Sequence, residues 1–192
     1  MLSSSIFWTV LAVMLFWAVG AYNRVVRLRS AALQAFGGLD THWVRMLALL
    51  SEWDVAQASA GLSAGPAHQS LQAATTEFGA TLAVARARPL QADAAGALVS
   101  ARDALELAWQ AWAAEVQVPP EPTEPTEGHE APNAPDVQNR APWSARWVQH
   151  RQQNALAQQQ FNDAVANYNA AIAQFPAQVL AWLFGFKPAR SL

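Results

Sequence analysis

The sequence predicts an all-α protein in which an apolar N-terminal helix leads into an elongated antiparallel bundle of about four helices. Alanine is the most frequent residue and runs of β-branched residues are absent, and both observations favour helix. Apolar residues also recur at steps of three and four in successive segments separated by Gly and Pro. Amphipathic helices of this kind must bury their apolar stripes against one another, which predicts a bundle.

The composition narrows the class of protein further. The 192 residues suit one domain with an anchor, and 53% are hydrophobic while only 14% are charged. About 25% charged residues is usual in a soluble domain. The net charge of −2 argues against a nucleic-acid partner. The lack of cysteine excludes disulfides, a cysteine metal site and a cysteine nucleophile.

Residues 1–22 are predicted to form a transmembrane anchor. The run LSSSIFWTVLAVMLFWAVGAY carries no charged side chain, and as a helix it spans about 30 Å, the thickness of a bilayer core. A cleaved signal peptide is the alternative, since Val19–Ala21 resembles a cleavage site, but the basic n-region is missing. Arg24, Arg27 and Arg29 follow directly, so the positive-inside rule predicts a body in the cytoplasm and an N-terminus outside.

Residues 23–118 are predicted to form the first three bundle helices. A turn with the sequence GLSAGP follows the first helix, and Pro89 ends the second because Pro lacks the N–H that a helix needs. The expected ranges are 23–60, 68–88 and 90–118, and the apolar stripe of the first consists of Phe36, Leu39, Trp43, Met46, Leu50 and Trp53.

Residues 119–141 are predicted to be a disordered, acidic, Pro-rich loop. Six of the eleven prolines and five acidic residues occur in PPEPTEPTEGHEAPNAPDVQN, which contains no base. Proline denies the segment the hydrogen bonds of helix and sheet, and little in it is apolar enough to bury. The segment is either a tolerated surface insertion or a ligand for a partner that reads proline motifs.

Residues 142–192 are predicted to form the last bundle helix, from Pro142 to Phe175, and an apolar C-terminal segment. The helix carries a coiled-coil-like seam with a 4-3-4-3 spacing, suited to packing against a long neighbour. Trp143 and Trp147 share one face, where they form either a partner patch or part of the core. The seam consists of Phe161, Val165, Tyr168, Ile172 and Phe175.

The C-terminal segment is predicted to return to the level of the membrane, because the last helix of an up-and-down bundle runs back towards the anchor. It is too short to span a bilayer. It therefore either lies in the membrane interface, with Lys187 near anionic headgroups, or caps the open end of the bundle. The residues concerned are Val179, Leu180, Trp182, Leu183, Phe184, Phe186 and Lys187.

Two stretches resemble the LemA family. AYNRVVRLR directly after the anchor is similar to the family's opening, Asp40 matches an aspartate further along that helix, and QQQFNDAVANYNAAIAQFPAQVLAWLFGFKP is similar to its C-terminal pattern. The stretch THWVRMLALLSEW, the region around HRQQNALAQ and the acidic loop depart from the family. The resemblance implies an anchored, elongated helical body in a bacterial membrane, with no established enzyme activity.

Two amides in the second stretch attract attention. Asn162 and Asn169 are seven residues apart, so they share a helix face beside the predicted seam. We expect them to hydrogen-bond across helices and fix the register. A polar ligand site is the alternative.

No catalytic residue, metal ligand or cofactor site is predicted. None of the four histidines has a second histidine or a carboxylate at a three- or four-residue helical spacing, and no phosphate-loop, dinucleotide, nucleophile-elbow or HExxH motif occurs. His42 remains a candidate only if tertiary contacts assemble a site around it.

These observations predict a single-pass protein of the bacterial inner membrane whose bundle is a non-enzymatic scaffold or interaction module. The expected partners are membrane lipid, a second copy of the chain and an unidentified envelope protein, with no nucleic acid. The alternative is a lipid-binding or membrane-shaping protein that uses its amphipathic helices and the C-terminal segment.

Overall fold

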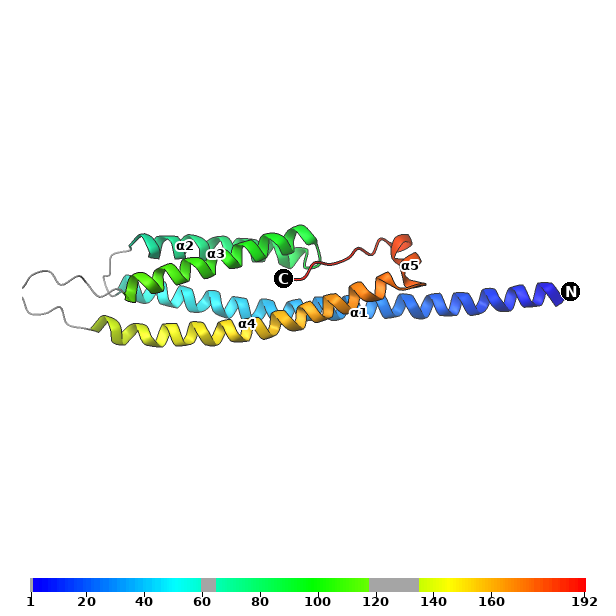
Figure 1. Ribbon diagram of the computed structural model, residues 1–192, viewed down its shortest axis with the longest axis horizontal. Coiled ribbons are helices and arrows are strands. Elements are labelled where there is room, and N and C mark those ends of the chain that lie inside the picture. The colour runs from blue at the N-terminus through cyan, green and yellow to red at the C-terminus, as the bar shows by residue number, and fades with distance from the viewer. Residues whose placement is uncertain (1, 60–64, 118–134) are drawn as a thin grey trace, which may run out of the picture.

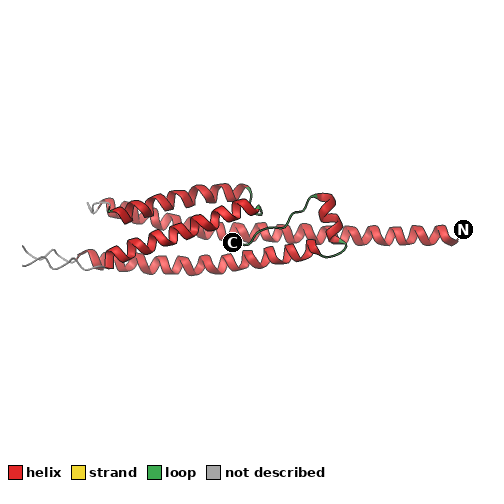
Figure 2. Ribbon diagram, turned by 45° about the horizontal axis from the view of Figure 1, so that its top comes forward, coloured by secondary structure: helices red, strands yellow, loops and turns green. Residues whose placement is uncertain are grey.

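The computed structural model shows a long rod of helices (Figures 1 and 2). It describes residues 2–59, 65–117 and 135–192, and these contain five helices and no strand. The all-α prediction is confirmed. The helices are α1 (Leu2–Ser59), α2 (Pro66–Ala87), α3 (Ala92–Gln117), α4 (Pro135–Ala173) and α5 (Ala177–Phe184).

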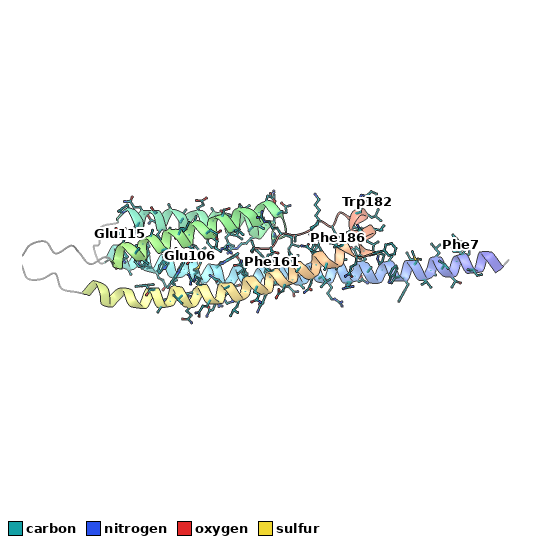
Figure 3. The ribbon with its side chains drawn as sticks, viewed as in Figure 1. Phe7, Glu106, Glu115, Phe161, Trp182 and Phe186 are labelled. Carbon is teal, nitrogen blue, oxygen red and sulfur yellow. The ribbon has the colours of Figure 1, made fainter. Side chains whose placement is uncertain are left out.

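Helix α1 combines the predicted anchor and the first bundle helix without a break. Its 58 residues correspond to about 87 Å of helix. The N-terminal part extends beyond the other helices, and Phe7 projects from this free portion (Figure 3). Within the described chain, α1 is the one helix long and apolar enough to cross a membrane, and its most apolar window contains no buried residue.

The bundle is built from two antiparallel helix pairs. Helix α1 packs along α4, and α2 packs along α3. The α2–α3 hairpin covers the half of the α1–α4 pair that lies away from the free part of α1 (Figure 1). The predicted antiparallel bundle is therefore confirmed, with helix ends within two residues of the expected positions for α1, α2 and α3.

The predicted apolar stripes form the core. Every residue of the stripe predicted on α1 is buried, from Phe36 to Trp53. Four of the five seam residues on α4 are buried as well, and Phe161 is fully covered. The prediction is wrong for Phe175, whose side chain is 66% exposed. Helix α4 ends at Ala173 and the chain turns at Pro176, so Phe175 has left the seam.

The end of the bundle remote from the anchor, which we call the distal end, contains a continuous aromatic cluster. Trp109 stacks on Trp147 with ring centroids 4.3 Å apart, and Trp112 lies 4.8 Å from Trp109. Trp53 lies 4.8 Å from Trp112 on its other side. All four rings are buried, so Trp147 belongs to the core and not to a partner patch. Trp143 is half-buried under the Arg146 guanidinium, 4.9 Å from its ring.

Helix α4 begins earlier than predicted. It starts at Pro135, so residues 135–141 are helical and do not belong to the expected disordered loop. The physical reason is that Pro is well suited to the first turn of a helix, where its missing N–H has no partner to lose. The rest of that loop, residues 119–134, lies outside the part of the chain that the structure describes.

Candidate functional site: the base of the bundle

The candidate site is the end of the bundle where α1 leaves it, which we call the base. Helix α5 packs there against α1 and buries Ala177 and Ala181. The ring of Tyr22 on α1 lies 5.1 Å from the ring of Phe184 and 6.0 Å from that of Phe186. The small alanines allow close approach, while the aromatic contacts fix α5 beside the last residues of the apolar segment.

The C-terminal tail, residues 185–192, runs from α5 back along α4 (Figure 1). Asn169 donates to the Ala189 carbonyl (2.8 Å) and accepts from the Ala189 N–H (2.9 Å). Asn162 makes the same pair of bonds with Leu192, both 2.9 Å long. The separation of seven positions between Asn162 and Asn169 corresponds to about 10.5 Å of helix. Three residues of extended tail cover about 10 Å, so the two spacings match.

Two further side chains, Tyr168 and Gln158, also bind the tail. We call these two residues together with Asn162 and Asn169 the tail clamp. The Tyr168 hydroxyl donates to the Lys187 carbonyl (3.0 Å), and burial raises the pKa of Tyr168, which keeps the hydroxyl a donor. Gln158 donates to the carbonyl of Leu192 (2.6 Å). The expectation that Asn162 and Asn169 bond to another helix is therefore wrong. Both amides bind backbone of the tail, a partner that helical spacing cannot reveal.

The predicted membrane-interface residues divide into two groups. Val179, Trp182, Leu183 and Phe184 are exposed, and Trp182, at 84%, is the most exposed large hydrophobic residue described. Its side chain projects away from the helices (Figure 3). Lys187 is also exposed, whereas Leu180 and Phe186 are half-buried. The alanine face of α5 thus caps the bundle, and its large apolar side chains point outward.

Positive charge gathers at the base. Arg24, Arg27 and Arg29 of α1 form no ion pair within the described residues, and the same holds for Lys187 and Arg190 of the tail. The sequence has no acidic residue before Asp40 and none after Asp163. We call Arg24, Arg27, Arg29 and Lys187 the basic collar, whereas Arg190 lies further along the tail, beside Gly96 of α3. Unneutralised charge beside an apolar segment is typical of a surface that meets anionic lipid.

Four acidic residues along the bundle pair with a residue of another helix. Asp40 is the residue that matches the aspartate of the LemA pattern. Its Oδ1 forms an ion pair with Nε of Arg86 on α2 at 2.7 Å. Glu52 pairs with Arg146 of α4 at 2.9 Å. Asp40 therefore pairs with Arg86 and not with His42. The Nδ1 atom of His42 is buried without a hydrogen-bond partner.

Sequence reasoning missed one histidine–carboxylate pair. His68 of α2 lies 2.8 Å from Asp54 of α1, and Gln72 donates to the other oxygen of that carboxylate at 3.2 Å. The three residues come from two helices, so no local spacing could have indicated them. Among the described residues no group of three or more His, Cys, Asp or Glu is able to hold a metal ion.

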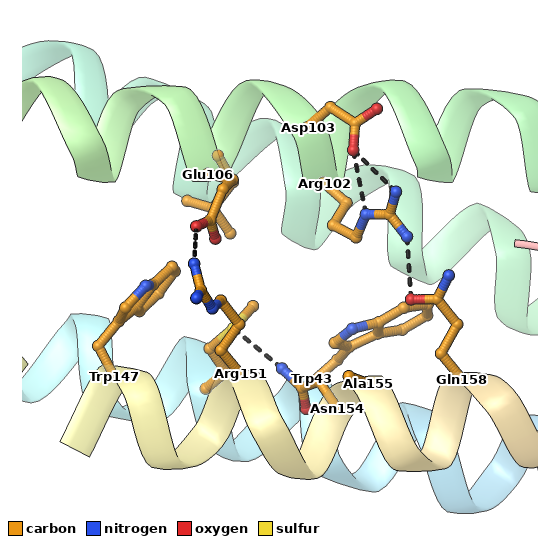
Figure 4. Close-up of a pocket in the computed structure, with 11 residues that line it drawn as sticks. Trp43, Arg102, Asp103, Glu106, Trp147, Arg151, Asn154, Ala155 and Gln158 are labelled. Carbon is orange, nitrogen blue, oxygen red and sulfur yellow. Dashed lines mark hydrogen bonds and ion pairs between the residues drawn. The ribbon is translucent and has the colours of Figure 1, made fainter. Parts of the chain in front are cut away.

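A cleft of about 310 Å³ lies between α3 and α4 (Figure 4). Arg151 bridges it to Glu106 at 2.7 Å, and Arg102 bridges it to Gln158 at 2.9 Å. Buried Asn154 at its floor donates to the sulfur of Met46 at 3.1 Å. These contacts join the α2–α3 hairpin to α4, so the side chains that line the cleft hold the helices together.

Fold and base together define a class: helical bundles carried on one long apolar helix, an architecture compatible with a single-pass membrane protein. The LemA family model matches residues 147–192, which include most of α4, all of α5 and the tail. This match supports a LemA family assignment and covers the C-terminal quarter of the chain. LemA is not a known family of enzymes. Comparisons with curated proteins and with solved structures found no significant match.

Proposed function

We propose that the protein is a single-pass protein of the bacterial inner membrane whose bundle works as a non-enzymatic scaffold. In this proposal residues 1–22 cross the membrane, the bundle stands in the cytoplasm, and two copies associate through α1. The observation that carries the proposal is a stripe of exposed uncharged side chains on α1, directed away from α4.

The outer stripe consists of Val26, Leu33, Val44 and Val55, which follow one another at steps of seven, eleven and eleven. Eleven residues are close to three full helical turns, so these positions share one face. Leu33 is 39% exposed, Val44 42% and Val55 65%. An apolar row of about 43 Å on one helix is typical of an interaction surface, because single exposed apolar residues do not line up in this way.

The anchor determines the geometry of such an association. Two copies inserted in one membrane with the same orientation hold α1 parallel, so the same residues of the two stripes face each other. Confinement to the membrane also raises the effective concentration of the second copy. A modest apolar stripe is then enough to hold a dimer that would dissociate in dilute solution.

Cysteine crosslinking in native membranes tests the proposal, and the chain has no native cysteine to interfere. We expect V44C to form a disulfide-linked dimer on oxidation. The matched control is L107C, an equally apolar position on α3 that is 66% exposed and lies off the stripe. Equal crosslinking of both variants, no crosslinking of V44C, or its exclusive crosslinking to a different envelope protein would contradict association of two copies through α1.

Lipid contact at the base is the second candidate function. The exposed apolar residues of α5 and the basic collar favour it, since one binds the acyl region and the other attracts anionic headgroups. This candidate predicts a lipid environment at Trp182 and an aqueous environment at Leu107. It does not compete with the scaffold proposal, because the outer stripe and α5 occupy different parts of the molecule.

A further inference from the structure

A groove of about 340 Å³ opens at the base between α1 and the turn that joins α4 to α5. Phe16 and Trp17 of α1 form one side of its apolar end, and Phe175 and Pro176 form the other. The rings of Trp17 and Phe175 contact each other at a tilt of 60°, with centroids 5.5 Å apart. The groove therefore lies beside the predicted anchor and not within the core of the bundle.

Small residues keep the groove open. Gly20 and Ala21 line it on α1, and Ala171 and Ala177 line it on the opposite side. A Cβ atom added at Gly20 would meet no atom within 4 Å. The space at this position is therefore not required by packing within the chain, and a side chain placed there would occupy the groove.

The end of the groove nearer the bundle is polar. Arg24 lies at this end and has no ion-pair partner within the described residues, while Gln174, which directly precedes Phe175, also lines the groove. Phe16 and Arg24 are eight residues apart on α1, which places them about 12 Å apart along the helix axis. The groove thus runs from aromatic rings to a free guanidinium in the direction from the apolar segment to the bundle.

We propose that this groove binds one anionic phospholipid. One acyl chain lies in the groove against the contacting rings of Trp17 and Phe175, and the phosphate pairs with Arg24 and accepts a hydrogen bond from the Gln174 amide. The proposal rests on the proposed membrane anchoring. The polarity of the groove matches that of a bilayer leaflet, since its aromatic end lies beside the apolar segment and the Arg24 guanidinium lies where α1 is proposed to leave the membrane.

Charge complementarity selects an anionic lipid over a zwitterionic one. A guanidinium offers a phosphate two parallel hydrogen bonds. The ammonium of a zwitterionic headgroup would then meet only the basic collar, because no acidic residue precedes Asp40 or follows Asp163. An anionic headgroup such as glycerol meets no such repulsion.

Native mass spectrometry of the full chain in detergent tests the proposal, with equal amounts of phosphatidylglycerol and phosphatidylcholine added. We expect one retained phosphatidylglycerol per chain, in preference to phosphatidylcholine, because both phosphates pair with Arg24 but the choline ammonium is repelled by the basic collar. R24Q should lower the retention of both lipids, because both carry the phosphate with which the guanidinium pairs. G20L should remove retention altogether because its side chain fills the groove.

R27Q is the matched control, since Arg27 belongs to the basic collar but does not line the groove. It should retain the lipid as the unmodified chain does. Equal retention of the two lipids, unchanged retention in R24Q and G20L, or an equal loss in R27Q would overturn the proposal. Displacement of the lipid by excess glycerol phosphate would also overturn it, since that headgroup has no acyl chain. Crosslinking at V44C is read separately, so the two proposals fail independently.

Discussion

The distal end and the base of the bundle are made from the same kinds of residues arranged in opposite ways. At the distal end four tryptophan rings face inward and form the core across three helices. At the base the large side chains of α5 face outward, and alanines face the bundle. Hydrogen bonds from α4 to the tail backbone then hold the base together.

This difference indicates what each end is for. A core of large rings stabilises a bundle through burial alone and needs no partner. The base uses polar bonds to hold α5 in place and leaves its apolar side chains uncovered, which is unfavourable in water. The chain therefore has a self-sufficient distal end and a base whose apolar surface is completed by something else, for which lipid is our proposal.

Truncating a tryptophan in the core of the distal end should cause the largest loss of stability. We expect W109A to lower the free energy of unfolding by about 3–5 kcal/mol, because it removes a buried ring that touches Trp112 and Trp147. Chemical denaturation followed by far-UV circular dichroism measures this. W182A is the control and should change stability by less than about 0.5 kcal/mol. A comparable loss in both variants would mean that the two ends do not differ as described.

The tail clamp should give a smaller and local effect. N169A removes both bonds to Ala189, which we expect to cost about 1–3 kcal/mol in the opening of the tail. Amide hydrogen exchange at Ala189 should accelerate, while exchange in the distal helices stays unchanged. N162A is the matched variant and should act on Leu192 instead. Unchanged protection at Ala189 would show that the clamp does not hold the tail.

The ion pair between Asp40 and Arg86 should contribute still less to the free energy of unfolding. Arg86 is 46% exposed, so we expect D40N to cost only about 0.2–1 kcal/mol, and less at high salt. A double-mutant cycle with R86Q isolates the pair. A coupling well above this range would mean that Asp40 has a role beyond joining α1 to α2.

The smallest effect should be on pH dependence. Burial, and next the charges of Arg146 and Arg45, lower the pKa of His150 below its usual value of 6.5. The unfolded chain then binds the proton more readily than the folded chain does, so stability falls as the pH drops from 6.5 towards the folded pKa. H150Q should flatten the dependence of the unfolding midpoint on pH in that window. An unchanged slope would exclude His150 as its source.

Sequence patterns predicted the parts of this fold that depend on local periodicity. The stripe from Phe36 to Trp53 and the seam from Phe161 to Ile172 follow helical spacing, and both are buried as expected. The sequence predicts that α4 begins at Pro142, whereas the helix accepts that residue in its interior and begins at Pro135.

The candidate site was predictable only in part. The composition of the C-terminal segment indicated which residues lie at the base, but not that alanines face inward and Trp182 outward. The tail clamp depends on Asn162 and Asn169 meeting residues 20 to 30 positions away, which no spacing encodes. His68 and Asp54 are 14 positions apart and lie on different helices, so local spacing does not reveal their pairing either.

The environment of residue 182 tests the central claim most directly. An environment-sensitive fluorophore attached to W182C, in the full chain reconstituted into anionic vesicles, should show blue-shifted emission and be quenched by spin-labelled lipid. The same fluorophore on L107C should emit as in water and escape that quenching. Water-like, unquenched emission at position 182 would contradict the account, because the apolar face of α5 would then have no lipid to cover it.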